Sequence, residues 1–276
     1  MPPETPKTHT PPESPASTEP TPHKLKHPGA APWSLRDLIF FVVSAVLALA
    51  TANLAVLTLY VALQPLAGWS LRPETLRENP FFLLTLQTVF HGLVLAYVYL
   101  LIVVNYRQRF WAGLKWRTPA KREAAFFFVG GTFLAVAIQF APTLLPDRED
   151  FPLQRLFSSP EAGYAIAAFA ILIAPFMEEL IFRGVLFSFF EHLVGVRFAV
   201  VGTTILFAAL HVPEYWGAWN HVFLVLLAGV VFSLARGLTG SLAPSVILHL
   251  AYNATLITVL FFETRQFRAV DVHLIF

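Results

Sequence analysis

Long apolar runs separated by short polar segments make up most of the chain after residue 37. The first run extends from Leu38 to Leu63, which is long enough to cross the ~30 Å hydrocarbon core of a bilayer as a helix. Further runs of similar character lie at about 81–104, 124–145, 162–190, 198–214, 219–235 and 241–262. The pattern predicts an all-α protein, a polytopic transmembrane helical bundle of about seven to eight helices.

The composition agrees with a membrane protein and excludes several classes of function. The chain is 56% hydrophobic and 13% charged, whereas soluble domains are about 25% charged. It has no cysteine, so disulfides, thiolate metal sites and a cysteine nucleophile are excluded. The net charge of +2 is small and the basic residues are spread over short loops, so nucleic-acid binding has no support.

The N-terminal segment differs from the rest of the chain. Residues 1–32 hold 10 of the 21 prolines and almost no large apolar side chains, which predicts a disordered tail. The loop between the second and third spans carries six basic residues: Arg107, Arg109, Lys115, Arg117, Lys121 and Arg122. The positive-inside rule therefore predicts that this loop and the N-terminal tail are cytoplasmic. An odd number of spans would place the C-terminus outside.

Three charged side chains lie near the middle of the predicted 162–190 span: Glu178, Glu179 and Arg183. A charge at the centre of a spanning helix costs roughly 2.5–3.5 kcal/mol, so such residues usually face the protein interior and serve a function. Glu179 and Arg183 are four residues apart and can pair along one helical face. Glu178 has no partner at such a spacing, which makes it the candidate working group.

Two histidines and an asparagine complete a second polar set. His211 follows thirteen uncharged residues, and His249 and Asn253 share one helical face in the last span. A glutamate with a histidine can hold and deprotonate water, while a second histidine and an amide can donate to an oxyanion. No sequence motif for a serine nucleophile or a zinc helix is present, so water is the favoured nucleophile of a peptide hydrolase. The other histidines considered, His91, His192, His221 and His273, are interpreted as structural or interfacial.

The motifs Glu178-Glu179-x-x-x-Arg183, Phe207-x-x-x-His211 and His249-x-x-x-Asn253, in this order on successive apolar spans, resemble those of a known family. It is the CAAX prenyl endopeptidase and bacteriocin-processing (CPBP, or Abi) family of intramembrane proteases, and the similarity covers about residues 160–258. The resemblance implies an intramembrane polar cavity in which Glu178 and His211 activate water and His249 and Asn253 stabilise the oxyanion. It also implies that Glu179, Arg183 and Phe207 support the site.

The resemblance predicts a division of the chain and a class of partner. Residues 33–160 are expected to be N-terminal scaffold helices, residues 161–262 the protease core and residues 263–276 a C-terminal tail. The expected substrate is a membrane-associated peptide or protein, and a prenylated one is one option among several. The expected location is the cell membrane.

Two questions stay open at this point. Family members are described both as metalloproteases and as metal-free glutamate enzymes, and His211, His249 and Glu178 would be just enough ligands for zinc. Asn253 is a poor zinc ligand, and the residue chemistry favours the metal-free mechanism. The alternative functions are a non-catalytic membrane immunity or scaffold protein and a proton-coupled transporter, although the chain shows no repeated halves.

Overall fold

The computed structural model describes residues 34–68, 72–140 and 156–268, besides Met1, and all regular structure in these residues is helical. The main helical segments are α1 (Leu35–Ala67), α3 (Pro80–Tyr99) continued by η1 (Leu100–Asn105), α5 (Lys121–Phe140), α6 to α8 (Pro160–Val194), α9 (Val196–His211), α10 (Trp219–Thr239) and α11 (Leu242–Glu263). Two short helices, α2 (Pro73–Arg77) and α4 (Phe110–Gly113), lie in the connections.

Six of the described helical segments are long and apolar enough to cross a membrane. The remaining long helix, α9, has 16 residues and is therefore only about 24 Å long. Helix α9 ends at His211, two residues before a proline that cannot continue the hydrogen-bond ladder. The predicted all-α, polytopic bundle is confirmed, and the chain is an integral, multi-pass membrane protein.

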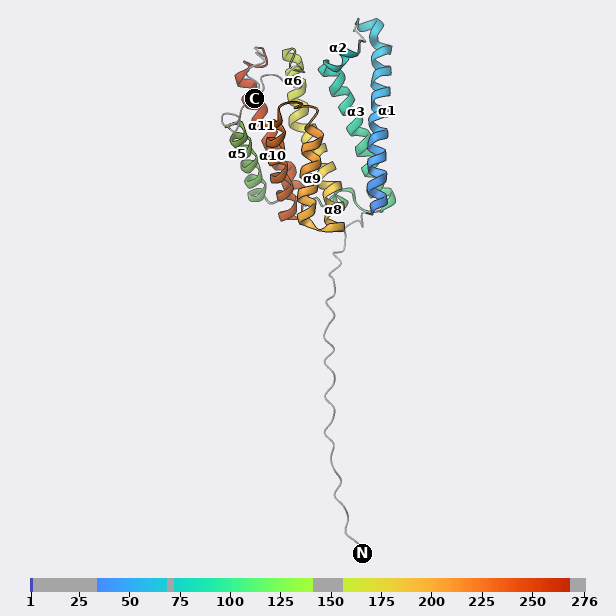
Figure 1. Cartoon of the computed structure of the whole chain (residues 1–276), viewed down its shortest axis with the longest axis vertical. Helices are drawn as coiled ribbons and strands as arrows, with labels where there is room; N and C mark the ends of the chain where they lie inside the picture. Colours follow the sequence, from blue (N-terminus) through green and yellow to red (C-terminus); the bar gives the residue numbers. More distant parts are fainter. Residues whose placement is uncertain (2–33, 69–71, 141–155, 269–276) are drawn as a thin grey trace.

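The helices run up and down between the two ends of the bundle (Figure 1). The start of α1 and the junction of α8 with α9 lie at one end, and α2 and the end of α11 lie at the other. The predicted disordered tail, the acidic segment at residues 147–150 and the last eight residues lie outside the described residues. The predicted cytoplasmic side of the bundle and the division into scaffold, core and tail stay predictions.

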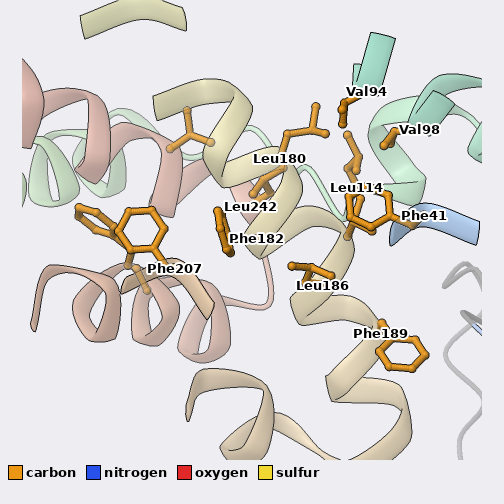
Figure 2. Packing of buried hydrophobic residues seen from close by; sticks show 14 of the residues in the cluster. Phe41, Val94, Val98, Leu114, Leu180, Phe182, Leu186, Phe189, Phe207 and Leu242 are labelled. Atoms are coloured by element: carbon orange, nitrogen blue, oxygen red, sulfur yellow. The ribbon is translucent and has the colours of Figure 1, made fainter. Parts of the chain in front are cut away.

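The buried core joins the first helices to the segment that carries the two glutamates. Figure 2 shows Phe41 of α1 and Leu114 beside Val94 and Val98 of α3. Leu114, in the connection after α4, is fully buried, and its amide donates to the Phe110 carbonyl in the short turn there. Apolar contacts of this kind fix the position of Leu180 in the charged segment, which belongs to the same cluster.

Helix α5 approaches α11 closely at Gly131, which gives a first testable prediction. A Cβ atom at Gly131 would overlap the carbonyl oxygen of Leu248 and lie 2.9 Å from the Cβ of Ala251, whereas one at Gly130 meets nothing within 4 Å. Gly131→Ala is therefore expected to cost about 1–3 kcal/mol by overpacking. Gly130→Ala is expected to be neutral or to gain up to about 1 kcal/mol from helix propensity.

The measurement is the thermal unfolding midpoint of the two purified variants in the same detergent. We expect a lower midpoint for Gly131→Ala only. Equal midpoints for the two variants would contradict the close contact between α5 and α11.

Candidate active site

The helix that carries the glutamates is not a regular α-helix. Between Pro160 and Val194 it contains two π-helical segments, η4 (Phe169–Ile173) and η5 (Leu180–Leu186). The short α7 (Ala174–Glu179), which holds Glu178 and Glu179, lies between them. π-Helical turns are rare, occur frequently at functional sites and leave a backbone carbonyl without its usual donor.

Asn253 supplies the donor that η4 lacks. The Ala174 amide donates to the carbonyl of Phe169, so it is not available to the carbonyl of Ala170, its partner in a regular α-helix. The Asn253 Nδ2 atom donates to that Ala170 carbonyl over 2.8 Å. One of the two amide hydrogens of Asn253 thus holds the helix of the glutamates, and the other is left for a second acceptor.

Glu179 and Arg183 form the ion pair expected from their spacing. The Arg183 Nη1 atom lies 2.8 Å from Glu179 Oε1, and both side chains are fully buried. The remaining donors of Arg183 go to the Ser233 hydroxyl over 3.3 Å and to the Gly229 carbonyl over 3.0 Å. The Ser245 hydroxyl donates to the second oxygen of Glu179. Because each nitrogen of the Arg183 guanidinium and each oxygen of the Glu179 carboxylate has a hydrogen-bond partner, the ion pair can stay fully buried.

His249 joins the two glutamates. Its Nδ1 atom lies 2.9 Å from Glu179 Oε1, its Nε2 atom lies 3.8 Å from Glu178 Oε2, and its ring stacks on Phe232 with centroids 4.2 Å apart. The Glu178 side chain is 25% exposed, in contrast to the buried Glu179. The two glutamates therefore differ in environment: one orients the imidazole, and the other faces it and remains accessible.

His211 is connected to His249 through Phe207, which packs between the two rings. The His211 Nδ1 atom is 2.8 Å from the Phe207 carbonyl oxygen, which can only accept, so Nδ1 carries the hydrogen and Nε2 of the neutral ring is an acceptor. The ring centroid of Phe207 is 4.5 Å from that of His211 and 5.9 Å from that of His249. Phe207 therefore packs against both histidines, and it also lies 4.6 Å from the Arg183 guanidinium.

Glu214 is a further carboxylate near the site that the sequence analysis did not consider. It lies three residues after His211, beyond the end of α9, and its side chain is exposed. Dehydration by the surrounding protein raises the pKa of the Glu214 carboxyl. The charge of His211 lowers this pKa, and the charge of Glu178 raises it. The Glu214 carboxyl is therefore within electrostatic range of His211 and Glu178.

Other residues of the network were also missed. They are Gly229, Phe232 and Ser233 of α10 and Ser245 of α11. For Ser245 a signal existed, because it precedes His249 by four residues and so lies on the face that already held His249 and Asn253. The other three residues lie on α10, which carries none of the three motifs, and nothing in the sequence of this helix singles them out.

Two of the remaining histidines have aromatic neighbours. The ring of His91 stacks on Phe169 at the start of η4 with centroids 6.0 Å apart, and that of His221 stacks on Tyr215 at 5.7 Å. His192 lies in the last turn of α8, and His273 lies outside the described residues. The structural interpretation of these histidines stays a prediction.

His211, His249 and Glu178, which would be just enough ligands for zinc, are not gathered as a metal site in the described part of the chain. Within residues 34–68, 72–140 and 156–268, no three histidine, aspartate or glutamate side chains gather as a metal site requires. A cavity of about 40 Å³ lies between α5, α10 and α11, lined by Ile138, Gln139, Tyr215, His221, Leu224, Val225, Tyr252 and Leu256. The predicted site residues are not in its wall.

Comparison with models of protein families gives a match. Residues 160–255 match the family model described as type II CAAX prenyl endopeptidase Rce1-like. The matched segment begins with α6 and ends two residues after Asn253, so it contains all three motifs and both π-helical segments. Comparisons with curated proteins and with solved structures give no match. Its helical fold, its three motifs and this match support the assignment of the segment from residue 160 to residue 255 to the CAAX-type (CPBP) family of intramembrane proteases.

Proposed function

We propose that the protein hydrolyses a peptide bond of a membrane-associated peptide or protein with a water molecule activated by Glu178 and His211. The observation that carries the proposal is the arrangement around His249. Its Nδ1 atom is held by the buried Glu179, and its Nε2 atom faces the accessible carboxylate of Glu178 at 3.8 Å. That separation exceeds a hydrogen bond, so Nε2 of His249 and the Glu178 carboxylate are not bonded to each other, and a reactant bound beside both groups can use them.

The steps follow from the donors and acceptors present. The water donates one hydrogen to Nε2 of His211, Glu178 takes its other proton, and the water oxygen bonds to the substrate carbonyl carbon. His249, when both ring nitrogens carry hydrogen, and the second amide hydrogen of Asn253 donate to the resulting oxyanion. The carbon–nitrogen bond then breaks, and Glu178 returns its proton to the leaving amine.

The proposed mechanism includes no metal step. His249 uses Nδ1 for Glu179 and Nε2 for the oxyanion, which leaves only His211 and Glu178 as ligands, fewer than the three that a catalytic zinc usually takes. We expect less than one zinc per ten protein molecules after purification, and cleavage that survives exhaustive chelation. Metal content by mass spectrometry and cleavage before and after chelation provide the measurement. Stoichiometric zinc, with activity lost on chelation and regained on adding zinc, would contradict this mechanism.

The substrate class is tested with matched peptides in nanodiscs. One peptide carries a prenylated cysteine near its C-terminus, and the other has the same sequence without the lipid. Cleavage of either one supports the protease, and preference for the first shows that the lipid is recognised. Tight binding of both peptides without any product would favour a non-catalytic immunity or scaffold protein.

We place the protein in the cell membrane, with the end of the bundle near the basic loop on the cytoplasmic side.

A further inference from the structure

A second buried arginine lies outside the three motifs. Arg236 is near the C-terminal end of α10, and its side chain is fully buried. The sequence analysis ended this span at residue 235, directly before it, whereas the helix continues to Thr239. Burying a guanidinium is costly unless its hydrogen-bond donors are used. The contacts of Arg236 therefore indicate what it does.

Arg236 contacts the site-bearing helix at three polar groups. Its Nε atom donates to the Arg183 carbonyl over 3.1 Å, and its Nη2 atom lies 3.3 Å from the Ser188 hydroxyl and 3.5 Å from Glu191 Oε2. Its guanidinium also lies 4.8 Å from the ring centroid of Phe187. Glu191 in turn pairs with Lys115 over 2.9 Å. All the groups that Arg236 binds on this helix belong to η5 or to the turns that follow it.

The hydrogen bond to the Arg183 carbonyl replaces one that η5 lacks. In a regular α-helix this carbonyl would accept from the amide of Phe187. In η5 that amide donates instead to the carbonyl of Phe182, one residue earlier. A buried carbonyl without a donor is destabilising, and the Nε atom of Arg236 provides the donor. Arg236 thus stabilises the π-helical bonding of η5 over the α-helical alternative.

The choice between the two bonding patterns matters for the site. A π-helical turn contains one residue more than an α-helical turn, so it rotates the residues after it by about 100° relative to those before it. Glu179 precedes η5 and Arg183 lies within it. If the Phe187 amide returned to the Arg183 carbonyl, the residues before η5, with Glu179 among them, would rotate relative to α8, and Glu179 would leave the position in which it contacts His249.

We infer that Arg236 is a positioning residue, which holds η5 in its π-helical form and so keeps Arg183 and Glu179 in place to orient His249. The effect on turnover rests on the proposed function, whereas the effect on His249 does not. Arg236 touches no reacting group, so it acts on the rate only through this chain of contacts. Loss of the Arg236 contact is expected to displace His249, and a displacement of about 1 Å in a catalytic site can lower the rate by about 100-fold.

The test compares Arg236→Lys with Ser188→Ala. Lysine keeps a positive charge for Glu191 but has no Nε donor, while Ser188→Ala removes another partner of the same guanidinium and leaves the Nε bond intact. We expect kcat of Arg236→Lys to fall about 10- to 100-fold with KM changed less than about twofold. We expect Ser188→Ala to retain kcat within about threefold. The carbon-bound ring hydrogen of His249, observed by NMR with labelled histidine and assigned with His249→Ala, is expected to shift in Arg236→Lys only.

Three results would overturn the inference. They are wild-type kcat in Arg236→Lys, an unchanged His249 resonance in that variant, and an equal loss of kcat in both variants. If Arg236→Lys does not fold, the neutral double variant Arg236→Gln/Glu191→Gln removes the charge pair together and provides the same two readouts. A wild-type protein that cleaves no peptide would contradict the proposed function, and the His249 resonance would still test the role of Arg236.

Discussion

Glu178→Gln is expected to abolish peptide cleavage and to leave the fold unchanged. The Glu178 carboxylate is partly exposed and lies 3.8 Å from His249 Nε2, and in the proposed mechanism it takes a proton from the attacking water. An amide of the same shape cannot accept the proton of the attacking water, and loss of a general base typically costs 10²- to 10⁴-fold in rate. The measurements are kcat with a cleaved peptide and the folded yield of the variant in detergent.

Glu178→Asp is the matched control for this prediction. It retains the carboxylate but moves it back by one methylene, so we expect low but measurable activity. Full activity of Glu178→Gln would show that another group activates the water. A loss of folded yield equal to that of Arg183→Ala would show that Glu178 is structural.

Arg183→Ala is expected to lower both the stability and the activity of the protein. It leaves the fully buried carboxylate of Glu179 without its ion partner, and breaking a buried pair in this way typically costs 3–5 kcal/mol. His249 would also lose its orientation, because it is held by the same carboxylate. The expected results are a reduced folded yield, a lower thermal unfolding midpoint and no detectable cleavage.

Two controls separate the charge from the contact. The double variant Glu179→Gln/Arg183→Met removes both charges and is expected to recover part of the lost stability but none of the activity. Lys115→Ala breaks a partly exposed ion pair with Glu191, and its effect on stability is expected to be below about 1 kcal/mol. An Arg183→Ala variant as stable as Lys115→Ala would contradict the buried pair.

The features that the sequence predicted depend on local periodicity. The spans follow from the length of the apolar runs, and the pairing of Glu179 with Arg183 follows from their spacing of four on one helix. His249 with Asn253 was placed on one face by the same rule. Spacing carries no information about how one helix is rotated against another, so the convergence of His249 with the two glutamates was expected, but the ring atoms by which it contacts each of them were not.

The features that were missed depend on tertiary contacts. The two π-helical segments within residues 160–194 persist where side chains of other helices, Asn253 and Arg236, bind the carbonyls that the helix leaves without a donor. No pattern within residues 160–194 specifies those partners. Arg236 itself was excluded from its span as a charged residue at the end of an apolar run, and only the contacts on neighbouring helices show that it is buried.

The most direct test of the hydrolytic site is a single-turnover reaction in water enriched in ¹⁸O. Excess wild-type protein in nanodiscs is incubated with a membrane-associated peptide that it cleaves, and the fragments are analysed by mass spectrometry. If Glu178 and His211 activate water, one ¹⁸O atom appears in the new carboxyl terminus during the first turnover, and Glu178→Gln under the same conditions yields no fragment. Fragments without ¹⁸O in that first turnover, or equal cleavage by the wild type and Glu178→Gln, would contradict a glutamate-activated water.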